Sequence, residues 1–125
     1  MNAPRCITVA ATALVLAVLF GAFGAHALRG RLSPDSLAVY RTAVDYHFWH
    51  GLGLLGVGTL MVAWPQSKRL SWVAGFLIAG LVLFCGGLYL LALGGPPWLG
   101  ALAPVGGVAF AAGWALLAVC AWERR

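Results

Sequence analysis

Three histidines, His26, His47 and His50, are the side chains of this sequence best suited to chemistry. An imidazole changes its charge near neutral pH and is a common metal ligand, so such a set could hold a metal or haem or move protons. His47 and His50 are three residues apart, which places them on one face of a helix. The candidate polar cluster that we predict around them consists of His26, His47, His50, Tyr46, Asp45, Arg41 and Tyr89.

The helices that position these residues are indicated by long stretches of sequence without charged side chains. Residues 6–28, 46–64 and 70–122 contain no Lys, Arg, Asp or Glu. A helix needs about 20 apolar residues to cross the hydrocarbon core, so the last run holds two spans. Backbone groups in lipid must be paired within the protein, which favours helices over irregular structure. The sequence therefore predicts one transmembrane domain, residues 1–125, with spans at about 6–28, 46–64, 70–93 and 101–122.

The predicted fold class is all-α: an integral membrane four-helix bundle of antiparallel up-down topology. Short connections such as residues 65–69 and 94–98 join antiparallel neighbours. A helical hairpin formed by the first two spans would bring His26 close to His47 and His50, at the entrance of the second span. Tyr89 would return to the same side near the end of the third span.

The second helix is expected to extend beyond the membrane. Ser33-Pro34-Asp35 is typical of a helix start, with a capping hydroxyl, a proline in the first turn and an acid near the positive end of the dipole. A helix from Pro34 to Trp64 would be about 46 Å long. We expect Leu37–Asp45 to project from the membrane or to lie along its surface, with Arg41 and Asp45 paired one turn apart.

Small residues recur at spacings that let membrane helices approach closely. The predicted helix-packing positions are Ala17, Gly21, Gly24, Ala25, Gly106 and Gly113. The three cysteines, Cys6, Cys85 and Cys120, have no metal-ligand or redox spacing, and we interpret Cys85 as an apolar filler of the third span.

Composition and charge placement narrow the class of protein. The chain is 62% hydrophobic and 9% charged, too few charges to cover a soluble globule. Its net charge of +5 comes from basic residues at the ends of the apolar runs, which excludes a nucleic-acid partner and indicates the lipid bilayer. Five Lys and Arg flank one side of the predicted topology and three flank the other, which favours both termini in the cytoplasm of a bacterial inner (plasma) membrane protein.

The first apolar run ends in Ala25-His26-Ala27, which imitates a signal-peptide cleavage site, but it is longer than a signal core and we expect it to be retained. The sequence contains no catalytic triad, no phosphate-binding loop and no acidic pair suited to hydrolysis, so we predict no enzymatic activity and no catalytic residues. No cofactor is predicted.

Two functions stay open at this point. The first is a non-enzymatic multipass protein that acts through interaction or assembly with other membrane proteins or by self-association. The alternative is a histidine-based protein that binds a metal or haem, or handles protons or a small solute, through His26, His47 and His50. No HExxH motif supports the metal form, and no carboxylate within the last two spans supports a proton relay across the membrane.

Four blocks of sequence resemble a known family. They are Gly21–Leu28 (GAFGAHAL), Thr42–His50 (TAVDYHFWH), Gly86–Leu93 (GGLYLLAL), and Pro104–Gly107 (PVGG) with Gly113-Trp114. In this order they resemble a small uncharacterised membrane family that includes the bacterial inner-membrane protein YgdD and eukaryotic relatives. Leu88 stands where that pattern has serine, and Gly51 stands where it has alanine. The resemblance implies a four-helix inner-membrane protein and carries no activity, catalytic residue or cofactor.

Overall fold

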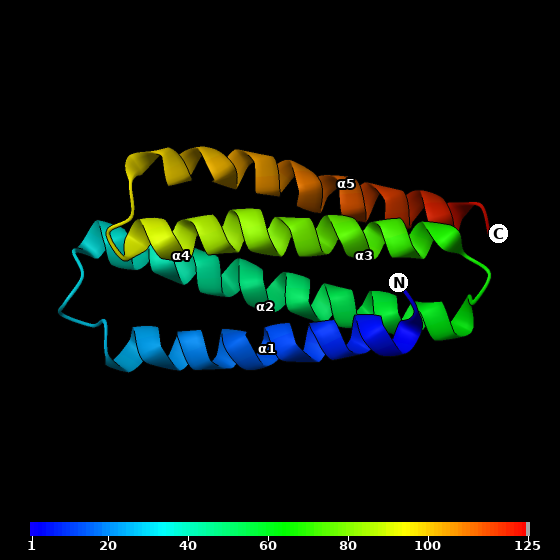
Figure 1. Ribbon diagram of the computed structural model, residues 1–125, viewed down its shortest axis with the longest axis horizontal. Helices are drawn as coiled ribbons and strands as arrows, with labels where there is room; N and C mark the ends of the chain where they lie inside the picture. Colours follow the sequence, from blue (N-terminus) through cyan, green and yellow to red (C-terminus); the bar gives the residue numbers. More distant parts are fainter. Residues whose placement is uncertain (125) are drawn as a thin grey trace.

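The protein is an elongated helical bundle in the computed structural model, which describes residues 1–124. Figure 1 shows the rods side by side, with both chain termini toward the same end. The elements are α1 (Ala3–His26), α2 (Pro34–Ala63), α3 (Lys68–Gly80), the π-helical segment η1 (Leu81–Gly86), α4 (Gly87–Ala92), the 3₁₀ segment η2 (Pro97–Ala101) and α5 (Leu102–Trp122).

Side chains cap the starts of the first two helices. The Asn2 side chain accepts a hydrogen bond from the Arg5 backbone N–H, and the Ser33 hydroxyl accepts one from Ser36 at 3.1 Å. Each bond satisfies a donor that has no partner inside the helix. The predicted start of the second helix at Pro34 is confirmed, and that helix has 30 residues.

The third rod contains a change of helix type that the sequence did not predict. In place of one regular helix over 70–93, α3 passes into the π-helical Leu81–Gly86 and then into α4. The neighbouring α5 approaches closely here: a Cβ added to Gly106 would lie 2.8 Å from the Cα of Phe84. Gly113 likewise packs against Leu77, at 3.1 Å from an added Cβ. The small residues of α5 therefore bring its backbone against α3 and η1.

Helix α2 lies at the centre of the packing. It contacts α1 along one side and the α3–η1–α4 rod along another, while α5 packs on α3 and η1. The α1–α2 interface uses glycines as well: an added Cβ at Gly51 would meet Leu14 at 3.0 Å, and one at Gly58 would meet Ile7 at 2.8 Å. These contacts bring the backbones of α1 and α2 close together.

Apolar side chains cover much of the outer surface. Val18, Leu19, Val82 and Val108 are each more than half exposed, as expected where lipid takes the place of water. Three stretches of the described chain are long and apolar enough to cross a membrane: Ala3–His26, Lys68–Ala92 and Pro97–Trp122. Helix α2 is not among them, because its histidines, charged residues and glycines lower its hydropathy. Composition therefore supports the first, third and fourth of the four predicted spans.

Candidate functional site

The three predicted histidines occupy different environments. His26 is the last residue of α1 and is exposed, whereas His47 and His50 are buried, each 7% exposed. Within residues 1–124, no three His, Cys, Asp or Glu side chains are arranged to hold a metal ion. The structure therefore does not bring the three imidazoles together, and a metal shared among them does not fit this arrangement.

His47 joins three helices. Its Nδ1 lies 3.0 Å from the hydroxyl oxygen of Tyr89 on α4, and its ring lies 6.2 Å from the ring of Phe20 on α1, centroid to centroid. In the tautomer that carries its proton on Nε2, the neutral imidazole can accept the Tyr89 O–H at Nδ1.

This position is deeper than the sequence indicated. Ala13, near the middle of α1, lines the same groove as His47, so His47 sits well inside the bundle and not at the entrance of a span. A polar pair at such a depth is costly unless its members bond to each other, and it is a candidate for function.

Tyr40 reinforces the same junction and was missing from the predicted cluster. Its buried hydroxyl donates a hydrogen bond to the Phe20 carbonyl on α1 at 2.5 Å, and its ring packs edge-on against Tyr89 with centroids 5.2 Å apart. Tyr89 also packs edge-on against Phe20, at 5.0 Å. The only sequence signal for this role was the position of Tyr40 on the apolar side of the second helix.

His50 belongs to a separate aromatic group. Its Nδ1–H donates to the Tyr46 carbonyl at 2.8 Å, and its ring stacks on Phe110 of α5 with centroids 3.4 Å apart. Tyr46 packs against Phe84 of η1, at 4.4 Å between centroids. His50 therefore ties α2 to α5, while His47 ties α2 to α1 and α4.

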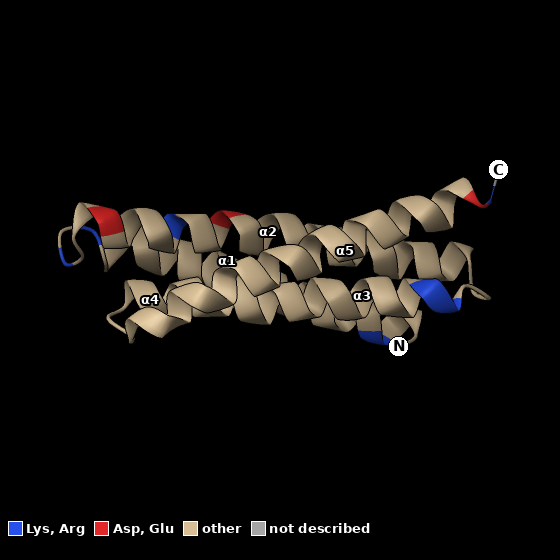
Figure 2. Ribbon diagram, turned by 90° about the horizontal axis from the view of Figure 1, so that it is seen from above, with Lys and Arg blue, Asp and Glu red and all other residues tan. Residues whose placement is uncertain are grey.

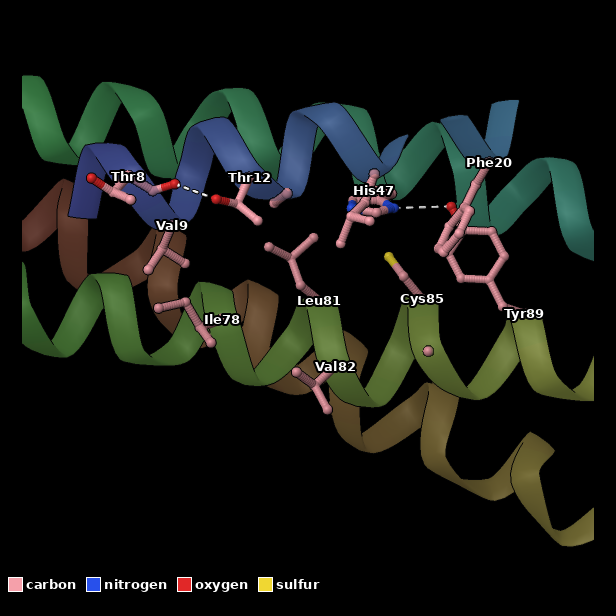
Figure 3. Close-up of a pocket in the computed structure, with 13 residues that line it drawn as sticks. Thr8, Val9, Thr12, Phe20, His47, Ile78, Leu81, Val82, Cys85 and Tyr89 are labelled. Carbon is pink, nitrogen blue, oxygen red and sulfur yellow. Dashed lines mark hydrogen bonds between the residues drawn. The ribbon is translucent and has the colours of Figure 1, made fainter. Parts of the chain in front are cut away.

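A groove of about 380 Å³ opens beside His47. Figure 3 shows α1 on one side, the α3–η1–α4 rod on the other, and His47 and Cys85 between them. The π-helical segment supplies Leu81, Val82, Cys85 and Gly86 to its wall. Segments of π-helix often occur at functional sites, and this volume is in the range of ligand pockets. The residues that line the groove are Thr8, Val9, Thr12, Ala13, Leu16, Phe20, His47, Ile78, Leu81, Val82, Cys85, Gly86 and Tyr89.

Arg41 and Asp45 lie away from this groove, on the exposed side of α2. Figure 2 shows the basic and acidic positions of α2 on one face of the bundle. They line a small hollow of about 120 Å³ with Gly21 and Gly24 of α1. The predicted Arg41–Asp45 ion pair is wrong: the ion pair found among the described residues joins Arg69 to Glu123, between the start of α3 and the end of α5.

The buried polar groups of the described site are paired within the protein. Every buried side-chain nitrogen or oxygen in residues 1–124 has a hydrogen-bond partner. The groove wall is largely hydrocarbon, and its histidine is hydrogen-bonded to Tyr89. This arrangement can accept an apolar molecule without leaving a polar group unpaired.

The helical fold and the apolar surface define a small membrane protein. The family model described as "Protein of unknown function (DUF423)" matches residues 20–107, and the chain belongs to this family. It is 39% identical over 117 residues to the UPF0382 membrane protein SH2409 of Staphylococcus haemolyticus, covering 94% of each chain. It is 41% identical over 107 residues to the UPF0382 membrane protein YwdK of Bacillus subtilis, covering 86% of this chain and 87% of that one.

These relatives support a membrane protein of an uncharacterised family and assign no role to it. The resemblance to YgdD and to eukaryotic proteins stays a prediction. No solved structure matches this chain.

Proposed function

We propose that this chain is a non-enzymatic multipass membrane protein that acts by assembling with a second copy of itself through the face of α2 that carries Arg41 and Asp45. In this proposal all four rods cross the bacterial plasma membrane in alternating directions, with both termini in the cytoplasm. The observation that carries it is the placement of two opposite, unpaired charges beside the apolar run of α1.

The depth of these charges supports an interface. Asp45 shares a hollow with Gly21, and Gly21 is seven residues before Leu28, the end of the charge-free run. Five of these residues belong to α1, which ends at His26, and they rise about 7.5 Å, so an embedded α1 would hold Asp45 within the hydrocarbon layer. A charge at the centre of a membrane helix costs about 2.5–3.5 kcal/mol on insertion scales. A second copy would replace lipid at this face and offset part of that cost.

This placement shortens the predicted extension of α2. Tyr40 packs over Gly24, which also lies inside the charge-free run of α1. In the proposed arrangement only the part of α2 before Tyr40 extends beyond the membrane, and Arg41 and Asp45 lie within it.

The charges favour a second copy as the partner because the Arg41 and Asp45 of one copy have charges opposite to the Asp45 and Arg41 of another. Arg41 and Asp45 are one turn apart on the same helix, so a two-fold axis beside α2 would let each Arg41 reach the Asp45 of the other copy. The same surface patch then serves both subunits, as a two-fold interface requires.

Counting subunits in lipid vesicles tests the proposal. Stepwise photobleaching of fluorescently tagged protein should show pairs for the wild type, and single copies for Arg41→Asp and for Asp45→Arg. The double variant R41D/D45R restores opposite charges and should restore the pairs. Asp35→Asn, an exposed acid in the first turn of the same helix, is the matched control.

A wild type that bleaches in single steps would overturn the proposal. So would a double variant that remains single, because the charges would then act on folding and not on assembly.

The alternative, proton or small-solute handling, is favoured by one observation: the hydrogen-bonded His47 and Tyr89 lie beside the groove, deep in the bundle. Proton flux into liposomes tests it, with Tyr89→Phe as the diagnostic variant. A flux equal to that of protein-free liposomes would end this alternative. Haem or metal binding by His26, His47 and His50 would require an arrangement other than the one described above.

A further inference from the structure

We propose that the groove between α1 and the α3–η1–α4 rod binds one acyl chain of an anionic phospholipid, whose phosphate contacts Arg5. This inference is independent of the α2 interface. It rests on the length, lining and opening of the groove, and on a second hollow that continues it toward the end of the bundle.

The groove has the length of a single chain in one leaflet. Its α1 wall runs from Thr8 to Phe20, and twelve helical residues rise about 18 Å. Half of the hydrocarbon core is about 15 Å thick. An acyl chain that entered near Thr8 would therefore reach the Phe20 end, beside Tyr89, without leaving the groove.

The lining selects hydrocarbon over water. The hydroxyls of Thr8 and Thr12 donate back to the carbonyls of Pro4 and Thr8, both at 2.9 Å, so these side chains have no hydroxyl proton left for a ligand. The Nδ1 atom of His47 is bonded to the Tyr89 hydroxyl. Water would find few partners here, and an apolar site without polar partners stays dry.

The opening of the groove faces the surrounding lipid. Its rim includes Leu16, which is 41% exposed, and Val82, which is 65% exposed. These side chains belong to the long apolar elements α1 and α3–η1–α4. The molecules that reach the groove from the side of the bundle are consequently the lipids of the bilayer.

A cation lies where the headgroup would be. A second hollow of about 600 Å³ is lined by Met1, Pro4, Arg5, Thr8 and Val9, and it shares Thr8 and Val9 with the groove. Figure 2 shows a basic position of α1 beside the N-terminus and the basic start of α3 at the same end of the bundle. Arginine binds phosphate with charge-assisted hydrogen bonds, so Arg5 gives the site a preference for an anionic headgroup.

Gly86 allows the groove to be filled without disturbing the fold. It lines the groove, and a Cβ added there would have no neighbour within 4 Å. Gly86→Leu therefore places a side chain in the space of the proposed acyl chain. Gly75→Leu is the matched control, because Gly75 is an exposed helical glycine with equally open surroundings and does not line the groove.

Native mass spectrometry of full-length protein tests the site, after reconstitution in vesicles of equal phosphatidylglycerol and phosphatidylcholine. The wild type and Gly75→Leu should retain one phosphatidylglycerol. Gly86→Leu should lower that occupancy about tenfold. Arg5→Gln should retain both lipids equally, while Arg29→Gln, at the other end of α1, should keep the wild-type preference.

A photoactivatable acyl chain locates the lipid. Phosphatidylglycerol with a diazirine near the chain end should label Phe20, Leu81 or Tyr89 in the wild type and should lose this label in Gly86→Leu. Retention of phosphatidylglycerol by Gly86→Leu at the wild-type level would overturn the proposal. Equal retention of the two lipids by the wild type would overturn the role of Arg5, and labelling spread over the whole surface would overturn the groove as the site.

Discussion

The ring of Tyr40 on α2 lies directly over Gly24 on α1, in a space where no side chain would fit. A Cβ at Gly24 would come within 2.9 Å of the ring atom Cδ1, and the hydroxyl of the same ring donates to the Phe20 carbonyl one turn earlier. The glycine and the tyrosine together set the separation of the first two helices. That separation in turn fixes where His47 meets α1.

Gly24→Ala should destabilise the protein by about 1–3 kcal/mol, because the Tyr40 ring must move and its hydrogen bond to Phe20 must lengthen. Unfolding in mixed detergent micelles, followed by circular dichroism, measures the difference. Gly75→Ala is the control: its added methyl meets nothing, and the loss of glycine from a helix should stabilise by about 0.5–1 kcal/mol. Equal stabilities of the two variants would show that the Tyr40 contact does not constrain the helices.

The His47–Tyr89 hydrogen bond should appear as a coupling energy. A double-mutant cycle with His47→Leu and Tyr89→Phe should give about 0.5–1.5 kcal/mol between the two sites, measured by the same unfolding method. The cycle of Tyr89→Phe with His50→Leu should be additive within about 0.5 kcal/mol, because His50 bonds to Tyr46 and stacks on Phe110 instead. Additivity in both cycles would mean that the buried pair contributes nothing specific.

Two adjacent glycines of α5 should respond differently to the same change. At Gly106 an added Cβ would lie 2.7 Å from the Cβ of Phe84, whereas at Gly107 it would lie 4.0 Å from the Phe84 ring. Gly106→Ala should therefore cost about 1–3 kcal/mol, since α5 must move away from η1, and Gly107→Ala should be neutral or stabilising. The order of their unfolding midpoints checks this, and the reverse order would refute the close approach of α5.

The helices themselves could be predicted from the sequence because the apolar runs are long, and the last run, residues 70–122, has room for two spans. The start of α2 at Pro34 could be predicted too, since Ser33, Pro34 and Asp35 each favour a helix start for a local reason. His47 and Tyr89 could be placed in one candidate cluster from the sequence because it predicts antiparallel helices, which return to the same side of the membrane. Their hydrogen bond is a matter of side-chain direction, which topology does not supply.

The depth of the histidines and the separation of His26 from them could not be predicted, because both depend on how far α1 is shifted along α2. That shift is set by contacts such as Gly51 with Leu14, between residues far apart in sequence. The π-helical segment likewise has no local signal: Leu81–Gly86 is apolar and would suit a regular helix. It occurs where Gly106 brings a second backbone against Phe84, which is a property of the pair of helices.

The π-helical segment also constrains how the chain length can vary. A π-helical turn holds one residue more than a turn of regular α-helix. Each residue of an α-helix adds a rotation of about 100°, so in a regular helix the extra residue would rotate all later side chains by that angle. Without the wide turn at Leu81–Gly86, Tyr89 would point away from His47. A relative with one residue fewer between Leu81 and Gly86 could keep the same pairing with an ordinary helix. A single-residue alignment gap at this place would therefore mark a change of helix type and not a shift of the tyrosine.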